Sequence, residues 1–183
     1  MLQRLYDALL TADRLYGGEA VTQREHALQC AWLAEQDGAG PELIVAALLH
    51  DAGHLVHHLG DACAASGVDD RHERTGAALV AQILPPAVSE PIRLHVEAKR
   101  WLCTRADGYR SSLSPASLTS LALQGGSFTS DEADRFLQQY HAAEAIRLRR
   151  WDDLAKTPGR VVPALDHFWR LVPLALKAQP ISG

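Results

Sequence analysis

The run from Leu43 to Leu49 most constrains the fold, because all seven of its residues are apolar. A helical segment without a polar face is expected to be buried on every side. The run leads directly into His50-Asp51, and Gly53 then offers the helix a place to stop or bend. Two polar side chains at the end of a buried helix need partners. A metal ion would satisfy both, although a core histidine bonded within the protein would also fit this pair alone.

Helical signals cover most of the remaining chain. Expected helices cover residues 2–15, 22–38, 77–83, 88–102, 114–124, 129–157 and 165–171, in addition to the apolar helix that starts at Pro41. Capping boxes mark two of the starts, Thr22 with Glu25 and Thr129 with Glu132. Residues 57–70 look like a loop, and no alternating strand pattern is found. We therefore expect an all-α bundle of about seven helices, forming a single domain over residues 1–183.

Composition narrows the functional classes. The net charge is −4 and no long basic run is present, which disfavours nucleic acid as a partner. No apolar run approaches the ~20 residues of a membrane span, and the N-terminus resembles an amphipathic helix more than a signal peptide. Cys30, Cys63 and Cys103 are odd in number and irregular in spacing, as expected for free thiols in a reducing compartment. We expect a cytoplasmic protein, and its nine histidines hint at metal or acid–base chemistry.

Histidine and aspartate side chains from five predicted segments lie beside apolar stripes and can point inward. These candidate metal ligands are His26, His50, Asp51, His72, His95 and Asp152. Six ligands suit two ions if one carboxylate bridges them, and Asp51 is the natural bridge. Imidazole and carboxylate without thiolate favour iron, manganese or zinc. Asp153 stands beside Asp152, but neighbours on a helix point about 100° apart, so we expect only one of them to be a ligand.

The order of these ligands resembles the HD-domain superfamily in its dinuclear form. The matching motifs are Tyr16–Glu19, Val21–His26, Leu49–His54, His95–Arg100, Leu113–Ser117, Leu123–Gly126 and Arg149–Asp153. Together they resemble the branch of mixed-valent di-iron oxygenases that includes inositol oxygenase and, in particular, the 2-amino-1-hydroxyethylphosphonate dioxygenase family. The His-Asp pair marks only the superfamily. The combination of Tyr16, Glu19, Lys99 and Ser117 is more specific.

The resemblance implies two iron ions, one Fe(II) and one Fe(III), with O2 as co-substrate. Residues matching His26, His50, Asp51 and Asp152 would hold one iron, and those matching Asp51, His72 and His95 would hold the other. The implied reaction is cleavage of the C–P bond of a small 1-hydroxyphosphonate to phosphate and a carboxylate such as glycine or betaine. The motif also selects Asp152 over Asp153.

Four residue types suit a bound phosphonate. His54 and Lys99 each follow a predicted ligand by four residues and so share its helical face. Lys99 is a compact cation, and Arg149 is a second possible partner for an anion. Ser117 lies in the first turn of a helix started by proline, where its hydroxyl and backbone N–H groups can meet phosphonate oxygens.

Tyr16 and Glu19 lie in a glycine-containing segment before the first predicted ligand. Tyr16 could occupy an open position on iron until substrate arrives. Glu19 could bind a cationic end of the substrate, but it does not choose between a primary amine and a trimethylammonium group, nor exclude hydroxymethylphosphonate. We expect Tyr16, Glu19 and His54 to take part in catalysis.

Two other functions remain open from the residues. One is an HD phosphohydrolase, which would cleave phosphate esters with a metal-bound hydroxide. The other is a non-enzymatic sensor on a relic fold, which the full set of ligands argues against. No role is assigned to four other histidines, which we expect to be surface or structural: His57, His58, His141 and His167. The oligomeric state, monomer or homodimer, is also left open.

Overall fold

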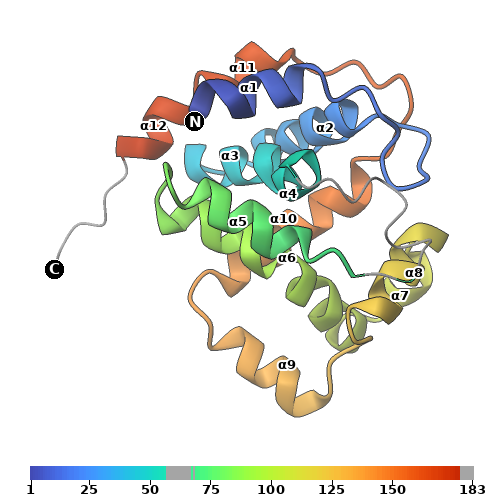
Figure 1. Ribbon diagram of the computed structural model, residues 1–183. Coiled ribbons are helices and arrows are strands. Elements are labelled where there is room, and N and C mark those ends of the chain that lie inside the picture. The colour runs from blue at the N-terminus through green and yellow to red at the C-terminus, as the bar shows by residue number, and fades with distance from the viewer. Residues whose placement is uncertain (57–66, 68, 178–183) are drawn as a thin grey trace, which may run out of the picture.

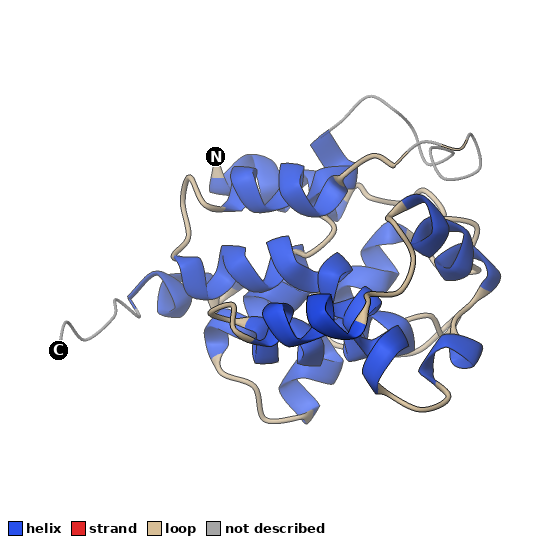
Figure 2. Cartoon of the chain, turned by 90° about the horizontal axis from the view of Figure 1, so that it is seen from below, coloured by secondary structure: helices blue, strands red, loops and turns tan. Residues whose placement is uncertain are grey.

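The computed structural model describes residues 1–183 except 57–66, 68 and 178–183. The described residues form helices and one isolated bridge between Leu15 and Thr22, so the predicted all-α class is confirmed (Figures 1 and 2). The helices are α1 Leu2–Leu10, α2 Gln23–Gln36, α3 Pro41–Leu49, α4 Ala52–Val56, α5 His72–Val80, α6 Pro86–Arg105, α7 Tyr109–Ser112, α8 Pro115–Leu123, α9 Ser130–Leu137, α10 Ala142–Leu154, α11 Leu165–Trp169 and α12 Val172–Lys177. The predicted number, about seven, is wrong, because several expected helices are interrupted and α7 was not expected.

Helix α3 is the central element of the fold. It packs against α2, α6, α10, α11 and α12, and every residue from Leu43 to Leu49 is buried. Pro41 begins it, as expected for a residue whose missing N–H costs nothing in the first turn. Because α3 is enclosed along its length, its C-terminal end delivers His50 and Asp51 into the interior of the bundle.

The chain breaks after α3 at Asp51, not at Gly53 as the glycine suggested. His50 is the C-cap of α3, and α4 restarts at Ala52. Gly53 instead allows the backbones of α4 and α5 to approach each other closely. A Cβ on Gly53 would lie 2.1 Å from the carbonyl oxygen of His72, and one on Gly76 would lie 2.8 Å from the backbone nitrogen of Gly53. The backbones of α4 and α5 therefore touch, which a larger residue at either position would prevent.

The helix expected over residues 129–157 is two helices, α9 and α10. His141 separates them with a φ of 69°, in the left-handed region that a continuous α-helix cannot contain. Tyr140, the residue before this break, is 85% exposed. The last expected helix, over residues 165–171, ends at Trp169 as α11, and a further short helix, α12, follows it from Val172.

The first helix ends at Leu10, not at Leu15. Thr11 closes it: the Thr11 backbone N–H donates to the carbonyl of Asp7, and the N–H of Ala12 donates to that of Leu9. The following segment to Thr22 is a loop closed by the bridge between Leu15 and Thr22, and it carries Tyr16, whose ring contacts His26. The shorter helix thus frees the residues that approach the candidate site.

Among the described cysteines, Cys30 is buried and Cys103 partly buried, and both are free thiols; Cys63 lies outside the described residues. Most of the expected loop over residues 57–70 also lies outside them. In the described part of the chain, no helix has the length and apolar character needed to cross a membrane.

Candidate metal centre

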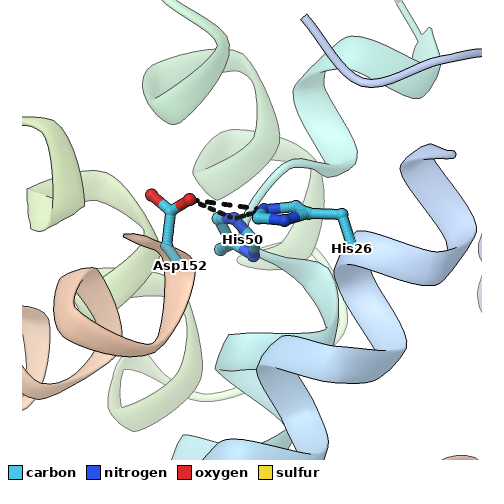
Figure 3. A group of neighbouring side chains, drawn as sticks. All are labelled: His26, His50 and Asp152. Carbon is cyan, nitrogen blue, oxygen red and sulfur yellow. Dashed lines mark hydrogen bonds and ion pairs between the residues drawn. The ribbon is translucent and has the colours of Figure 1, made fainter. Parts of the chain in front are cut away.

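Two histidines and one aspartate from three helices point toward one another (Figure 3). His26 comes from α2, His50 from the end of α3 and Asp152 from α10, and all three are buried. The Nε2 atoms of His26 and His50 lie 3.2 Å apart. Oδ1 of Asp152 lies 3.3 Å from His26 Nε2 and 3.9 Å from His50 Nε2. Three possible ligand atoms thus face one point.

A second pair of histidines repeats this arrangement. His72 is the first residue of α5, and His95 lies in the middle of α6. Their Nε2 atoms are also 3.2 Å apart. The approach of α4 to α5 at Gly53 holds His72 on this side of the bundle.

In its neutral form, each of the four imidazoles presents a lone pair at Nε2. In each ring Nδ1 lies within hydrogen-bond distance of an oxygen that can only accept, so the proton of the neutral ring resides on Nδ1. The acceptors are Ala155 O for His26 (2.9 Å), Ala47 O for His50 (2.8 Å), Asp70 Oδ1 for His72 (2.9 Å) and Ile92 O for His95 (2.7 Å). Each close Nε2 pair is therefore two acceptors facing one another, and a cation between them would relieve the repulsion.

Asp51 lies between the two pairs and turns one oxygen toward each. Its Oδ2 lies 3.2 Å from His50 Nε2 and 3.7 Å from His26 Nε2. Its Oδ1 lies 3.5 Å from His72 Nε2 and 3.9 Å from His95 Nε2. This division is the one that a carboxylate bridging two ions would need.

The residues fit a pair of metal ions. Two ligands each about 2.1 Å from one ion, at tetrahedral or octahedral angles, lie about 3.0–3.4 Å apart. Both closest Nε2 pairs and the His26–Asp152 contact fall in this range. Both oxygens of Asp51 and Oδ1 of Asp152 are buried without a hydrogen bond from the described residues. Buried carboxylate oxygens without a partner destabilise the folded protein, so cations are expected at this centre.

The electrostatics keep the carboxylates ionised and the nearby thiol neutral. Burial alone would raise the pKa of Asp51, but His50 outweighs it and holds that pKa well below its ordinary value. Arg149 does the same for the pKa of Asp152. Burial raises the pKa of the Cys30 thiol, which therefore stays protonated beside the centre. The available donors are imidazole and carboxylate, the set that suits iron, manganese or zinc.

Arg149 is buried and already paired with two carboxylates. Its Nη1 donates to Asp152 Oδ2 at 2.6 Å, and its Nη2 and Nε donate to Asp153. Tyr109 donates its hydroxyl to Asp153 as well. Sequence reasoning offered Arg149 as an anion partner. In the structure its first task is to orient Asp152, and Asp153 is its counter-ion.

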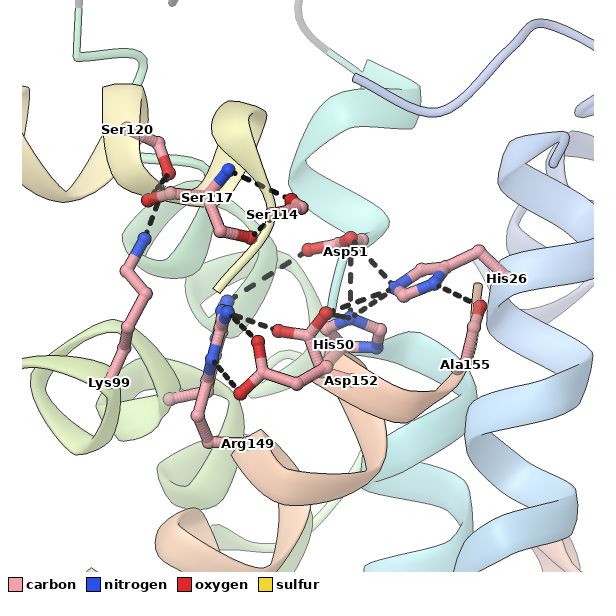
Figure 4. A network of polar contacts seen from close by, with 12 residues as sticks. His26, His50, Asp51, Lys99, Ser114, Ser117, Ser120, Arg149, Asp152 and Ala155 are labelled. Atoms are coloured by element: carbon pink, nitrogen blue, oxygen red, sulfur yellow. Dashed lines mark hydrogen bonds and ion pairs between the residues drawn. The ribbon is translucent and has the colours of Figure 1, made fainter. Parts of the chain in front are cut away.

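Lys99 is buried and has no carboxylate partner in the described part of the chain. Only 2% of it is exposed, and the partner that the described residues give its Nζ is Ser120 Oγ at 2.9 Å (Figure 4). Burial lowers the pKa of Lys99 to about 7, and the positive charge of Arg149 acts in the same direction. Ser117, also buried, lies on the same short helix α8 as Ser120. An anion bound here would supply the counter-charge that Lys99 lacks.

Tyr16 lies directly over His26. Its ring stacks on His26 with centroids 3.8 Å apart and an interplanar angle of 11°. Burial and the carboxylates of Asp152 and Asp51 raise the pKa of the Tyr16 hydroxyl well above its usual value, so it remains a phenol.

Glu19 is paired with a residue that sequence reasoning missed. Its Oε1 accepts hydrogen bonds from Lys156 Nζ at 3.1 Å and from Ser114 Oγ at 2.7 Å. Lys156 also donates to Ser117 Oγ at 3.1 Å. Lys156 follows Asp152 by four residues just beyond the end of α10, and that spacing was the available signal.

His54 and Asp70 complete the second half of the centre. The His54 ring stacks on His72 with centroids 4.2 Å apart, and its Nδ1 lies 3.0 Å from Asp70 Oδ2. One ligand atom each of His54, Asp51 and His72 lie within 4.8 Å of one another, so His54 is a further candidate ligand. Asp70, which orients both imidazoles, was missed although it precedes His72 by only two residues.

The remaining histidines pair elsewhere or are not described. His167 Nε2 bonds to Glu35 at 2.8 Å, and His141 Nδ1 lies 3.8 Å from Glu144. His57 and His58 lie outside the described residues.

Comparisons with known proteins agree on one family. The model of the HD domain matches residues 24–155, which include all six predicted ligands. Hydroxymethylphosphonate dioxygenase of Gimesia maris is 43% identical over 172 residues, covering 90% of this chain and 82% of that protein. The glycine-betaine-forming [1-hydroxy-2-(trimethylamino)ethyl]phosphonate dioxygenase of Leisingera caerulea is 39% identical over 160 residues, covering 87% and 82%. An uncharacterised protein of Acanthamoeba polyphaga mimivirus is 31% identical, covering 92% and 77%.

Proposed function

This chain belongs to the HD-domain family, together with relatives named as hydroxyphosphonate dioxygenases, and we propose that it oxidises a small 1-hydroxyphosphonate with O2. In the reaction, the C1–H and C1–P bonds break and C1 becomes a carboxylate carbon. One molecule of O2 takes up the four electrons, and its two atoms enter the products. The products are a carboxylate, phosphate and one proton, which balances the substrate and O2.

We infer that the resident metals are two irons in the Fe(II)/Fe(III) state. When bound, they would supply the activation of O2 and a Lewis-acid contact for the substrate. His26, His50, Asp152 and one oxygen of Asp51 would hold one iron. His72, His95 and the other oxygen of Asp51 would hold the second, with His54 close enough to assist.

The protein side chains would bind and orient the phosphonate. Lys99 supplies a buried positive charge, and Ser117 and Ser120 supply hydroxyls on the adjacent turn of α8. His54 is oriented by Asp70 and can donate from its other ring nitrogen. Tyr16 covers His26, where its ring would limit access of water until substrate displaces it.

The position of Asp51 is the observation that carries this proposal. One buried carboxylate faces two histidine pairs, each with the ligand spacing of its own ion. A single-metal hydrolase would not need the second pair. A two-metal hydrolase would need the second pair as well. The oxygenase is favoured over it by the names of the relatives and by Lys99, Ser117 and Ser120, whose positive charge and hydroxyls suit a phosphonate.

The test is to load the purified protein with iron under anaerobic conditions and add hydroxymethylphosphonate. We expect phosphate release only after O2 is admitted, with one O2 consumed per phosphate and formate as the carboxylate product. Phosphate release from a phosphate ester without O2 uptake, and none from the phosphonate, would instead establish the phosphohydrolase. Absence of turnover with both, despite a full complement of metal, would refute both activities.

A further inference from the structure

The ion pair between Lys156 and Glu19 lies in the site but has no role in the proposed reaction. The pair lies where three parts of the chain meet: the loop between α1 and α2 that carries Tyr16, the segment after α10 and the start of α8. Both side chains are mostly buried, with 13% of Lys156 and 18% of Glu19 exposed. An ion pair this protected from water is weakly screened and stays formed at ordinary salt concentrations.

The hydrogen bonds around the pair fix its position. Lys156 Nζ donates to Glu19 Oε1 and to Ser117 Oγ, both at 3.1 Å, and lies 5.7 Å from the centre of the Tyr16 ring. Ser114, the N-cap of α8, donates to the same Glu19 oxygen at 2.7 Å. Lys156 therefore stands beside Ser117, one of the proposed phosphonate contacts, and in front of the carboxylate that could read a cationic substrate tail.

We propose that Lys156 acts as a built-in counter-ion of Glu19 and makes the protein select hydroxyphosphonates without a cationic tail. This inference rests on the proposed function. A substrate ammonium approaching Glu19 finds its charge already neutralised and meets the like charge of Lys156. A tail-free substrate such as hydroxymethylphosphonate meets neither obstacle. The sequence comparisons do not decide the point, because one relative is named for hydroxymethylphosphonate and another for a trimethylamino substrate.

The charges elsewhere in the site agree with this assignment. Arg149 is neutralised by Asp152 and Asp153. Lys99 has no carboxylate partner among the residues that the structure describes, and so remains to attract the phosphonate. The site thus contains a cation prepared for the anionic head of the substrate, whereas Glu19, the carboxylate proposed for a cationic tail, is already paired with Lys156.

The experiment compares wild type with Lys156→Met, using Lys177→Met as a matched control. Lys177 is an exposed lysine at the end of α12, so its loss removes the same charge away from the site. The substrates are hydroxymethylphosphonate and 2-amino-1-hydroxyethylphosphonate. We expect wild type and Lys177→Met to prefer the tail-free substrate by at least about tenfold in kcat/KM, and Lys156→Met to lose or reverse that preference.

A binding measurement separates this inference from the proposed function. Methylphosphonate and 2-aminoethylphosphonate lack the 1-hydroxyl, and their affinities for the iron-loaded protein can be measured by calorimetry without O2. If wild type turns over no hydroxyphosphonate, the proposed function fails, while the ratio of these two affinities still tests Lys156. Adding Glu19→Gln to Lys156→Met should abolish the gained affinity for the amine.

Two results would overturn the inference. In the first, wild type binds the amine-bearing ligand more tightly than methylphosphonate. In the second, Lys156→Met weakens all phosphonates equally, which would make Lys156 a phosphonate contact instead of a counter-ion. Lys156→Gln, which keeps a hydrogen-bond donor, provides a second variant if the Met substitution does not fold.

Discussion

Replacing Lys99 with Met should stabilise the protein while weakening its hold on substrate. Lys99 is buried, has one neutral hydrogen-bond partner and has its pKa lowered from 10.5 to about 7 by burial and by Arg149. At about 1.4 kcal/mol per pH unit, keeping this charge costs the folded state at most about 5 kcal/mol near neutral pH. Structural relaxation and the lost bond to Ser120 reduce the net gain, so we expect Lys99→Met to raise the free energy of unfolding by about 1–4 kcal/mol.

The pH dependence gives this prediction its sharpest test. Between pH 7 and 10.5 the unfolded chain still binds the Lys99 proton, whereas the folded protein has largely released it. The stability contribution of wild-type Lys99 therefore rises with pH through this window. In urea unfolding at matched metal content, the advantage of Lys99→Met should be large at pH 6.5 and small at pH 10. The KM for hydroxymethylphosphonate should rise at least about tenfold, with metal content unchanged. Lys177→Met is the control. A variant that is no more stable than wild type at pH 6.5 would refute the reasoning.

Three further outcomes can be checked. Asp51→Asn should reduce the metal content from two ions to fewer than one per chain, because the bridging carboxylate serves both histidine pairs, whereas His72→Ala should retain about one ion. Metal analysis after gel filtration tests this, and two ions in Asp51→Asn would contradict the bridging role. Gly53→Ala should destabilise the protein by about 2–4 kcal/mol in thermal unfolding, because its Cβ would meet the His72 carbonyl at 2.1 Å; an unchanged Tm would contradict the close approach. Substrate KM should rise with pH above about 7 as Lys99 loses its proton, and Lys99→Arg, which stays charged, should lack that rise; a parallel rise in both proteins would assign the titration elsewhere.

The helix class and the central element were predictable because they follow from local chemistry. A run of seven apolar residues after Pro41 allows few alternatives to a buried helix, and the two capping boxes formed as expected. The breaks were less predictable. His141 adopts a left-handed conformation with no glycine to announce it, and the break at Asp51 carries no local signal beyond the nearby glycine.

The candidate ligands were visible in the sequence, but their partners were not. His-Asp spacing and the family motifs single out residues that would bind metal. Lys156 and Tyr109 act through contacts with residues distant in the chain, and Asp70 orients His54 as well as the neighbouring His72; the apolar periodicity of a helix predicts none of these contacts. Arg149 shows the limit most clearly, since its charge suggested a substrate contact and only the structure pairs it with Asp152 and Asp153.

The Nδ1 hydrogen bonds of the four imidazoles have a consequence for how the centre is assembled. Each ring is held by an oxygen of the folded chain, three of them backbone carbonyls, so the ligands are preorganised before any ion arrives. The apolar core around α3 is complete without metal, in contrast to small domains that fold only when zinc binds. Removal of metal by a chelator and unfolding should accordingly be separate events, and an emptied protein should regain its ions without refolding.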